Sequence, residues 1–315
     1  MKKNLLHRLI YIFSFSLCTF INNYTMASSE ETIFNLKEIE QGIYLHEGVH
    51  VNFDDIQNDD IANIGFILGE KCIAVIDTGG SVRIGKNLLK TIRKKTNLPI
   101  CYVINTHIHF DHYLGNLAFI NEQSEFIGHQ NIADTIDVNR EYFLDQFPDN
   151  LGPNPTSKSI TEPNITVQDT MKIDLGERFL LLTAYKTAHS HSDLTIFDSK
   201  TKTLWAGDLL FRERIPALDG SLKGWLSVLE MIKRQDILTI IPGHGTPTKK
   251  WMEAIAVEEE YLYLLLNETR QAIAEGQFMG EILETVGSEE KEKWLLYDQH
   301  HKRNVSKAFT ELEWE

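Results

Sequence analysis

Short apolar runs separated by turns make up the first third of the chain. The runs at 42–46, 63–69 and 72–76 are rich in branched residues, which is typical of strands with a buried face. Between the first two runs, residues 51–61 are polar and acidic and predict a loop or a hairpin flap. A further apolar run at 100–105 has the same character, so the pattern predicts a strand-rich first part.

Helical periodicity occurs between and after these runs. Apolar residues recur at helical spacing over 84–92, and residues 130–144 are interpreted as a helix in the same way. Further helices are predicted over 222–232 and in the tail after Lys249, where apolar residues between 255 and 273 share one face. Because strand-like and helical segments interleave, the pattern predicts a mixed α and β protein.

Strand-like runs return at 126–128 and follow one another in hairpin fashion from 166 to 205. The Pro-, Asn- and Ser-rich residues 147–163 predict a loop long enough to border an active site. The sequence contains no internal repeat, and residues 28–315 are predicted to form one domain with a helical C-terminal tail.

Side chains that can bind metals cluster where one apolar run ends. The run at 100–105 leads into the sequence THIHFDH, in which His107, His109 and Asp111 alternate as on an extended segment. His112 breaks this alternation, which predicts a turn that presents all four side chains from one loop. The carboxyl ends of strands in α/β sheets are where ligand-binding groups gather, so the pattern predicts a metal site there.

Three more side chains of this kind follow later apolar runs, namely His189, Asp208 and His244. Imidazoles and carboxylates suit Zn²⁺, Mn²⁺ or Fe. With the four groups of the first loop, the candidates outnumber the ligands that one tetrahedral ion accepts. Two ions are therefore expected.

The series HIHFDH, AHSHSD, AGD and PGHG resembles the metallo-β-lactamase superfamily of metal-dependent hydrolases. The resemblance implies an α+β fold, an αββα four-layer sandwich in which two mixed sheets lie face to face with helices outside. It implies two Zn²⁺ ions, with Fe or Mn as alternatives. The implied ligands are His107, His109 and His189 for one ion, Asp111, His112 and His244 for the other, and Asp208 as a bridge.

This resemblance also implies a reaction. Two cations roughly 3.5–4 Å apart share a water whose pKa falls to about 7, and the hydroxide attacks a carbonyl polarised by one ion. Asp111 is the candidate catalytic residue, because its carboxylate can orient that water or accept its proton. The implied function is hydrolysis of a small ester, thioester, lactone or lactam. At Asp208 the true β-lactamases carry Cys or Ser, so the chain resembles glyoxalase II and the lactonases more closely.

A narrower resemblance runs through the motifs DTGGS, LWAGDLLF, PALDGSLKGW and ELEWE. They look like the exported quinoprotein relay system zinc metallohydrolases, which implies a periplasmic dehydrogenase or sulfur-oxidation system as partner. Two rival functions stay open. One is a mononuclear iron enzyme resembling the persulfide dioxygenases, with His107, His189 and Asp208 on one ion. The other is a periplasmic accessory protein whose metal site is structural.

Weaker predictions concern the surroundings of the ligands. Asp77 resembles a carboxylate that the family packs beneath the metal ligands, although a plain turn residue is an equal alternative. Arg212 and Arg214 either clamp a substrate carboxylate or remain solvated charges, and Trp225 offers a flat apolar wall. His191 is expected beneath the ligands or exposed. The other histidines are expected in surface or structural roles: His46, His50, His129, His300 and His301.

The N-terminus has the layout of a secretory signal peptide over residues 1–27. Lys2, Lys3 and Arg8 precede an apolar stretch too short for a comfortable membrane span, and cleavage is predicted after Ala27. An uncleaved anchor is the alternative. A periplasmic or secreted protein is therefore expected, without stable membrane insertion after processing.

Charge and cysteine usage narrow the partners and the redox setting. The formal net charge is −14, and loss of the three basic leader residues would take it to −17. This excess argues against nucleic acid or an anionic membrane as partner and leaves a small-molecule substrate. Cys72 and Cys101 remain after cleavage in apolar runs. A disulfide between them is one option, but two buried free thiols are expected.

Overall fold

The computed structural model describes residues 34–51 and 59–315. The predicted signal peptide and most of the predicted flap at 51–61 lie outside the described residues. The described residues belong to a unit that begins at Thr32. Within the described residues, no helix combines the length and apolar character needed to cross a bilayer.

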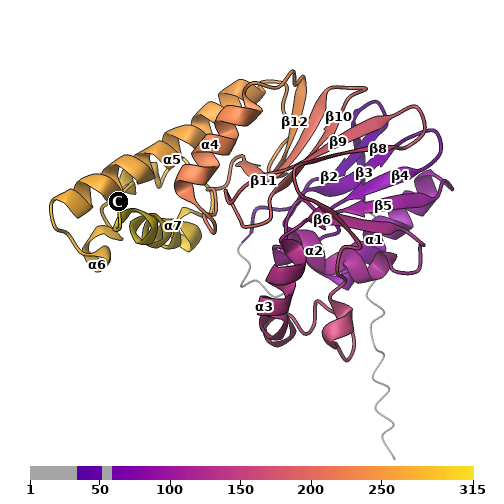
Figure 1. Cartoon of the computed structure of the whole chain (residues 1–315), viewed down its shortest axis with the longest axis horizontal. Coiled ribbons are helices and arrows are strands. Elements are labelled where there is room, and N and C mark those ends of the chain that lie inside the picture. Colours follow the sequence, from indigo (N-terminus) through magenta and orange to yellow (C-terminus); the bar gives the residue numbers. More distant parts are fainter. Residues whose placement is uncertain (1–33, 52–58) are drawn as a thin grey trace, which may run out of the picture. The chain divides into compact units, whose positions relative to one another are not determined.

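Two β-sheets form the centre of this unit (Figure 1). The first has the order β1-β2-β3-β4-β5-β6-β7, antiparallel from β1 to β4 and parallel from β4 to β7. Its strands are β1 (Lys37–Glu40), β2 (Ile43–His46), β3 (Ile64–Leu68), β4 (Ile73–Ile76), β5 (Ile100–Ile104), β6 (Glu125–His129) and β7 (Ile165–Val167).

The second sheet has the order β12-β11-β10-β9-β8, in which only the β11–β12 pair is parallel. Its strands are β8 (Thr170–Asp174), β9 (Phe179–Ala184), β10 (Leu194–Asp198), β11 (Thr203–Phe211) and β12 (Thr239–His244). All residues of β4, β11 and β12 are buried. Burial on both faces explains why these strands read as continuous apolar runs in the sequence.

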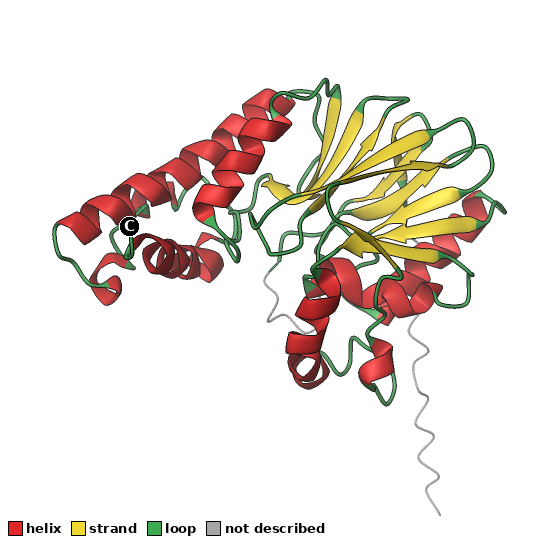
Figure 2. Ribbon diagram, in the orientation of Figure 1, coloured by secondary structure: helices red, strands yellow, loops and turns green. Residues whose placement is uncertain are grey.

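Apolar side chains from both sheets pack between them, including Ile43 and Ile104 from the first and Leu182 and Trp205 from the second. Helices cover the outer faces (Figure 2). The helix α1 packs on the first sheet, while α4 and α5 contact β11 of the second. The α-helices are α1 (Val82–Lys95), α2 (Phe110–Tyr113), α3 (Ile132–Gln146), α4 (Leu222–Ile232), α5 (Trp251–Ala274), α6 (Met279–Ile282) and α7 (Tyr297–Leu312).

The predicted α+β four-layer sandwich is confirmed. Two strand boundaries differ from the prediction in a way that matters for the site. Asp208 was expected just past a strand, but it lies inside β11, and His244 is the last residue of β12. The reason is that the β11–β12 ladder continues through register shifts as far as the pair Phe211↔His244.

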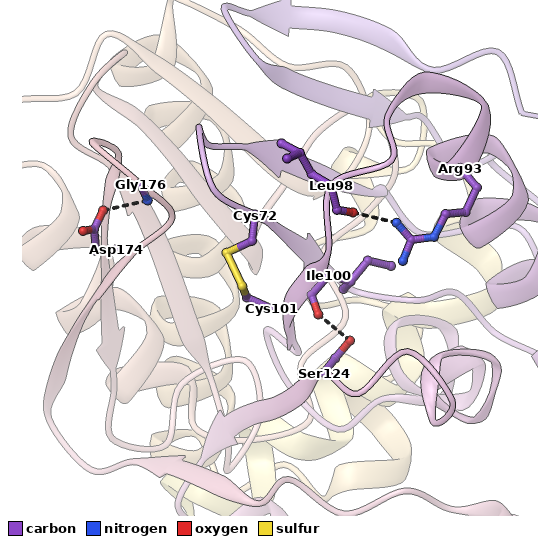
Figure 3. The surroundings of a disulfide bond; sticks show 8 residues. All are labelled: Cys72, Arg93, Leu98, Ile100, Cys101, Ser124, Asp174 and Gly176. Atoms are coloured by element: carbon purple, nitrogen blue, oxygen red, sulfur yellow. Dashed lines mark hydrogen bonds between the residues drawn. A yellow bond between two sulfur atoms is a disulfide. The ribbon is translucent and has the colours of Figure 1, made fainter.

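The expectation of two free thiols is wrong, because Cys72 and Cys101 form a disulfide (Figure 3). Cys72 directly precedes Ile73, Cys101 directly follows Ile100, and these two isoleucines pair across the parallel strands β4 and β5. The two cysteine Cα atoms therefore lie 5.8 Å apart, well within the range that a disulfide spans. Strand pairing supplied the proximity that the apolar runs alone did not reveal.

Candidate metal centre

The seven predicted ligands converge from five segments of the chain. They form two groups, and the ligand atoms within each group lie within 4.8 Å of one another. The first group contains His107, His109, His189 and Asp208, and the second contains Asp111, His112 and His244. The loop after β5 and the short helix α2 supply four of them, the β9–β10 loop supplies His189, and β11 and β12 supply the other two.

In the first group, the Nε2 atom of His189 lies 3.0 Å from Nδ1 of His109. The carboxylate of Asp208 faces both His189 and His107, with Oδ2 at 3.5 Å and 3.8 Å from their Nε2 atoms. Three imidazoles and one carboxylate therefore point at one small volume, which is a donor set suited to a borderline metal ion.

In the second group, Oδ2 of Asp111 lies 3.3 Å from Nε2 of His244 and 3.7 Å from Nε2 of His112. Asp208 also reaches this group, because its Oδ1 lies 3.0 Å from His112 Nε2 and its Oδ2 lies 3.3 Å from His244 Nε2. Asp208 thus faces both groups, as expected of a bridging carboxylate.

Each of the five imidazoles has its outer ring nitrogen held by another protein group. Such contacts fix the tautomer and aim the other nitrogen at a metal. The contacts are His107 Nδ1 to Thr106 Oγ1 (3.0 Å), His109 Nε2 to Asp219 Oδ2 (3.1 Å), His112 Nδ1 to Asp77 Oδ2 (2.8 Å), His189 Nδ1 to the Ala217 carbonyl (2.7 Å) and His244 Nδ1 to the Ile61 carbonyl (2.7 Å).

The inner atoms, by contrast, face only one another. His107 Nε2, His112 Nε2 and Asp208 Oδ1 are buried, and no well-aligned hydrogen bond satisfies them in the described part of the chain, although His112 Nε2 and Asp208 Oδ1 lie 3.0 Å apart. Buried polar atoms are normally satisfied, so all three atoms would gain a partner from a bound cation. A pair of metal ions would satisfy them, and the donor set fits that assignment.

The charge states of His107, His189 and Asp208 also fit cation binding. Burial lowers the pKa of His107 well below its usual value and lowers the pKa of His189 to about 3. Both imidazoles are therefore neutral, which is the form that binds metals. Burial tends to raise the pKa of Asp208, but the surrounding imidazoles outweigh it and hold that pKa well below its usual value.

Asp77 lies directly beneath the ligands, which distinguishes it from a plain turn residue. It is fully buried, and its carboxylate accepts hydrogen bonds from the Thr106 amide and hydroxyl and from His112 Nδ1, each at 2.8 Å. The backbone φ of Asp77 is 54°, a left-handed conformation that is uncommon outside glycine. One carboxylate thus aligns the start of the metal loop and its last histidine.

Two other buried side chains shape the remaining ligand loops. Asp193 accepts hydrogen bonds from the amide and hydroxyl of Ser190, at 2.8 Å and 2.7 Å, and so closes the turn that carries His189. Asn63 donates to the carbonyls of Pro242 and Gly245, at 2.9 Å and 2.7 Å, on both sides of His244. These bonds fix the backbone on either side of His244 and in the turn that carries His189.

Close backbone packing places Asp208 between the two groups. Gly207 has φ of 55°, and a Cβ at this position would meet the Thr106 side chain at 2.6 Å. A Cβ at Gly243 would meet Oδ1 of Asp208 at 1.8 Å. The glycines of the AGD and PGHG motifs therefore let β11, β12 and the metal loop approach one another.

A cavity of about 620 Å³ opens onto the ligands. Only one of the two predicted arginines lines it. Arg214 is buried and lines this cavity. Arg212 does not line it, because its guanidinium donates to the Thr246 carbonyl instead. Glu213 between them has φ of 70°, and the Arg214 amide donates to the Arg212 carbonyl at 2.8 Å, so the chain turns here and the two side chains have different surroundings. Only Arg214 therefore remains a candidate for substrate binding.

Trp225 does not form the predicted wall of the cavity. It is fully buried, its Nε1 donates to the Leu209 carbonyl, and its ring packs edge-on against the His189 ring at 5.2 Å between centroids. Trp225 belongs to α4, which packs behind the second sheet, so its ring supports His189 from the side away from the cavity.

The histidines outside the ligand set mostly behave as expected. His129 and His301 are buried and bonded to backbone carbonyls, of Tyr185 and Val286 respectively, and His191 is exposed at the cavity rim. His300 is the exception. Its Nε2 accepts from Arg214 at 3.1 Å, and it lines the cavity together with other residues of α7. The remaining two pair with carboxylates: His46 with Asp60 and His50 with Glu213.

Sequence reasoning missed the role of Asp219. Its carboxylate accepts from His109 Nε2 and pairs with Arg303 and Lys307 of α7. Asp219 stands in the PALDGSLKGW motif, so the motif contained the signal. Nothing local in the tail, however, indicated that α7 returns to the metal centre.

Comparisons with known proteins agree with this geometry. A model of the metallo-beta-lactamase superfamily matches residues 58–244, more than half of the chain. A metallo-beta-lactamase from Pontibacter korlensis has a TM-score of 0.59 at 16% identity, covering 72% of this chain and 98% of that protein. The DIM-1 metallo-beta-lactamase gives 0.57 at 15% identity, covering 73% and 97%.

A third structure extends further along the chain. The sec-alkylsulfatase Pisa1 from Pseudomonas sp. gives a TM-score of 0.64 at 16% identity and covers 87% of this chain, which spans about half (49%) of that protein. No curated protein matches the chain. Because the family match includes all seven candidate ligands and the structure has the four layers, the chain belongs to the metallo-beta-lactamase superfamily.

Proposed function

We propose that this protein is a hydrolase of small carbonyl substrates that works with two metal ions, zinc in the first instance. The observation that carries the proposal is the position of Asp208. Its two carboxylate oxygens face two separate groups of ligands, and every imidazole in these groups has its outer nitrogen bound by another protein group. Members of this superfamily are mostly hydrolases.

Two cations bound here would act as Lewis acids toward a carbonyl group and would lower the pKa of a water molecule to about 7. The five imidazoles, Asp111 and Asp208 would hold them, and the outer contacts keep the imidazoles aimed without further rearrangement. Asp111 lines the cavity, so its carboxylate can orient a water or accept its proton. Burial tends to raise the pKa of Asp111, but His112 and His244 outweigh it, so the carboxylate is ionised and ready for that role.

The substrate is proposed to carry an anionic group that pairs with Arg214. This side chain is buried on the cavity wall, and in the described part of the chain it forms no ion pair with a carboxylate. An unpaired buried guanidinium is costly, and a substrate carboxylate would offset that cost through two parallel hydrogen bonds.

The two rival functions fit the geometry less well. A mononuclear iron enzyme needs His107, His189 and Asp208, but it leaves no purpose for the second group, which has three buried ligands. A purely structural metal site is normally closed by protein ligands, whereas these ligands face a cavity of about 620 Å³. The open cavity therefore favours an enzyme.

Export is proposed from the leader-like N-terminus and is supported by the disulfide. Disulfides persist in oxidising compartments and are rare in the cytosol of mesophiles, so the Cys72–Cys101 bond is in keeping with a periplasmic or secreted protein. The narrower assignment to the quinoprotein relay system zinc metallohydrolases, with a periplasmic dehydrogenase system as partner, rests on the motifs of the sequence. Intact-mass measurement on cell-envelope material would check cleavage after Ala27.

The test of the proposed function combines metal analysis with a substrate screen. Zinc-loaded protein should hold about two ions per chain and should hydrolyse at least one ester, thioester, lactone or lactam. Sulfate esters belong in the same screen because Pisa1, an alkylsulfatase, resembles this chain over 87% of its length. The variant His244→Ala should lose one ion and most of the activity. One tightly held iron, with oxygen consumption on a persulfide, would instead support the dioxygenase.

A further inference from the structure

The cavity above the ligands has two chemically different walls. On one side, the metal loop, α3 and the residue after α3 contribute Phe110, Tyr142, Phe143 and Phe147. On the other side, the loop after β11 and the helix α7 contribute Arg214, His300, Arg303 and Lys307. Figure 1 shows α3 and α7 as separate helices from distant parts of the sequence. The ligands His109, Asp111 and Asp208 line the same cavity.

The aromatic wall is a packed cluster with one exposed member. The rings of Phe110 and Phe147 stack with centroids 4.8 Å apart and planes at 14°, and the Tyr142 ring meets Phe147 edge-on at 5.9 Å. Phe143 and Phe147 are buried in an apolar cluster, while Tyr142 is 55% exposed. The wall is therefore rigid from behind and presents an apolar surface to the cavity.

The cationic wall has one guanidinium that makes no direct salt bridge in the described part of the chain, although the charges of Asp111 and Asp208 act on it. Arg303 and Lys307 both pair with Asp219. Arg214 is 4% exposed, and its Nε has no hydrogen-bond partner in the described part of the chain. Its Nη1 lies 3.3 Å from His244 Nδ1, and its Nη2 donates to His300 Nε2. Burial, followed by the charge of Arg214, lowers the pKa of His300 to about 4, so this neighbour is neutral. A planar anion is the ligand that this wall lacks.

We propose that the substrate is an amphiphilic carboxylate, in which an aromatic or branched alkyl group packs on the aromatic wall while the carboxylate binds Arg214. The hydrolysed bond then lies between the two groups, over the metal ligands on the floor of the cavity. This inference rests on the proposed hydrolase function and narrows its substrate class. A cavity of about 620 Å³ is of ordinary size for such a small molecule.

The test uses four hydroxamates that share one metal-binding group. They differ in two positions: phenyl or hydroxymethyl on one side, and carboxylate or carboxamide on the other. Titration calorimetry with the zinc-loaded full chain should show tighter binding by about tenfold for phenyl over hydroxymethyl. Carboxylate should be preferred over carboxamide by about ten- to a hundredfold.

Two variants should remove these preferences separately. Tyr142→Ala should reduce the phenyl preference and leave the carboxylate preference intact, with Tyr263→Ala on α5 as the matched control because Tyr263 is 43% exposed and lies outside the cavity lining. Arg214→Gln should abolish only the carboxylate preference, with Arg212→Gln as the matched control two residues away. If Arg214→Gln does not fold, Arg214→Lys should keep the charge but weaken the preference, because an ammonium lacks the planar fork.

The outcomes separate this proposal from the proposed function. Both preferences without turnover of the corresponding esters would support the amphiphilic site and overturn the hydrolase. Equal binding of all four hydroxamates, within about twofold, would overturn the amphiphilic site while leaving hydrolysis of other carbonyl substrates open. Failure of all four to bind zinc-loaded protein would count against the metal centre, and hence against both proposals.

Discussion

The two ligand groups differ in how the rest of the chain holds them. In the second group the side chains of His112, His244 and Asp111 are 0%, 2% and 8% exposed. Their outer contacts come from Asp77 at the end of β4 and from the Ile61 carbonyl. The second group is therefore fixed mainly by the sheet and by the segment that precedes it.

The first group depends more on the late part of the chain. His109 is 28% exposed, and its outer contact is Asp219. The helix α7 in turn holds the Asp219 loop, because Asn304 donates to the Pro216 carbonyl at 2.7 Å and accepts from the Leu218 amide at 2.9 Å. One group is thus built into the sandwich, and the other is completed by the C-terminal helix. Substitutions on the two sides should differ in their consequences.

The largest expected effect comes from replacing Asp208, the residue that faces both groups. Asp208→Ala removes the carboxylate that faces His112, His189 and His244. We expect metal content to fall from about two ions per chain to below about one, because neither group keeps a complete donor set. The loss in kcat/KM should exceed about a thousandfold, beyond the ten- to hundredfold typical of residues that only contact a ligand.

The matched variant for this prediction is His189→Ala, which removes a ligand from the first group alone. It should retain about one ion, held by the second group. Metal analysis after exhaustive dialysis compares the two variants directly. Retention of two ions by Asp208→Ala would show that the groups are independent and that the carboxylate does not bridge.

A second prediction compares the two supporting carboxylates, Asp77→Asn and Asp219→Asn. Each substitution replaces a negative outer contact of one histidine with a neutral amide, and such changes typically cost about ten- to a hundredfold in metal affinity. Asp77→Asn should cause the larger loss of metal affinity, because Asp77 is fully buried and accepts hydrogen bonds from both Thr106 and His112. Asp219→Asn should lie at the lower end, because water can replace its bond to the part-exposed His109.

Competition with a chromophoric zinc chelator measures both affinities in one assay. An equal loss in the two variants would contradict the difference in rigidity between the groups. Asp219→Asn should also remove the ion pairs that Arg303 and Lys307 make with this carboxylate. Substrates that bind near α7 should therefore change in KM more than in kcat.

The sequence identified the seven side chains that the structure brings together, because their signals are local. The alternation from His107 to Asp111, and the apolar runs before Asp208 and His244, each depend on neighbours within a few residues. Strand ends in a sandwich meet at one edge, so several strand-end ligands imply a single site. The flanking helices were also predictable from local signals, because helical spacing of apolar residues is visible within a short window.

Features that depend on pairing between distant segments were not predictable in this way. The Cys72–Cys101 bond requires that β4 and β5 be neighbours in a specific register. The different surroundings of Arg212 and Arg214 depend on the turn at Glu213, where φ is 70°. The contact of Asp219 with Arg303 spans 84 residues of sequence. None of these distances is encoded in a local pattern.

A third prediction concerns the disulfide, which ties together the two strands that deliver Asp77 and the metal loop. The double variant Cys72→Ser/Cys101→Ser should lower the free energy of unfolding by about 3–4 kcal/mol, because the bond closes a loop with a sequence separation of 29. Activity at moderate temperature should change by less than about twofold, since the bond lies at the far end of these strands from the ligands. Denaturant titration of the apo and zinc-loaded proteins provides the measurement.

Zinc-loaded protein should recover part of this stability, because metal binds only the folded state. Reduction of wild-type protein should change zinc affinity by less than about twofold, because the bond contacts neither the ligands nor their outer partners. A larger drop would mean that the disulfide also positions the ligands.

The last prediction concerns a buried carboxyl on the helical side of the site. Glu258 of α5 is fully buried, its Oε1 accepts from the Phe211 amide at 2.8 Å, and its Oε2 has no partner in the described part of the chain. The Phe211 ring stacks on His244 at 5.1 Å between centroids. Burial raises the pKa of Glu258 well above its usual value, and the nearby Asp208 and Glu259 add to this shift.

The direction of the resulting pH dependence follows from linkage. Below pH 4.5 Glu258 is protonated in both states, so stability is unaffected by its ionisation. As pH rises further, the unfolded chain ionises at this position while the folded chain does not, and stability falls by up to about 1.4 kcal/mol per pH unit until the folded pKa is passed. Glu258→Gln keeps an acceptor for Phe211 and removes this fall, so its stability relative to wild type should increase with pH.

Denaturant titrations between pH 4 and 8 measure the difference, with Glu253→Gln, an exposed carboxyl on the same helix, as the matched control. Activity at neutral pH should stay within about twofold of wild type, because Phe211 keeps its hydrogen bond and its stacking on His244. A stability difference that does not vary with pH would show that Glu258 is ionised in the folded protein.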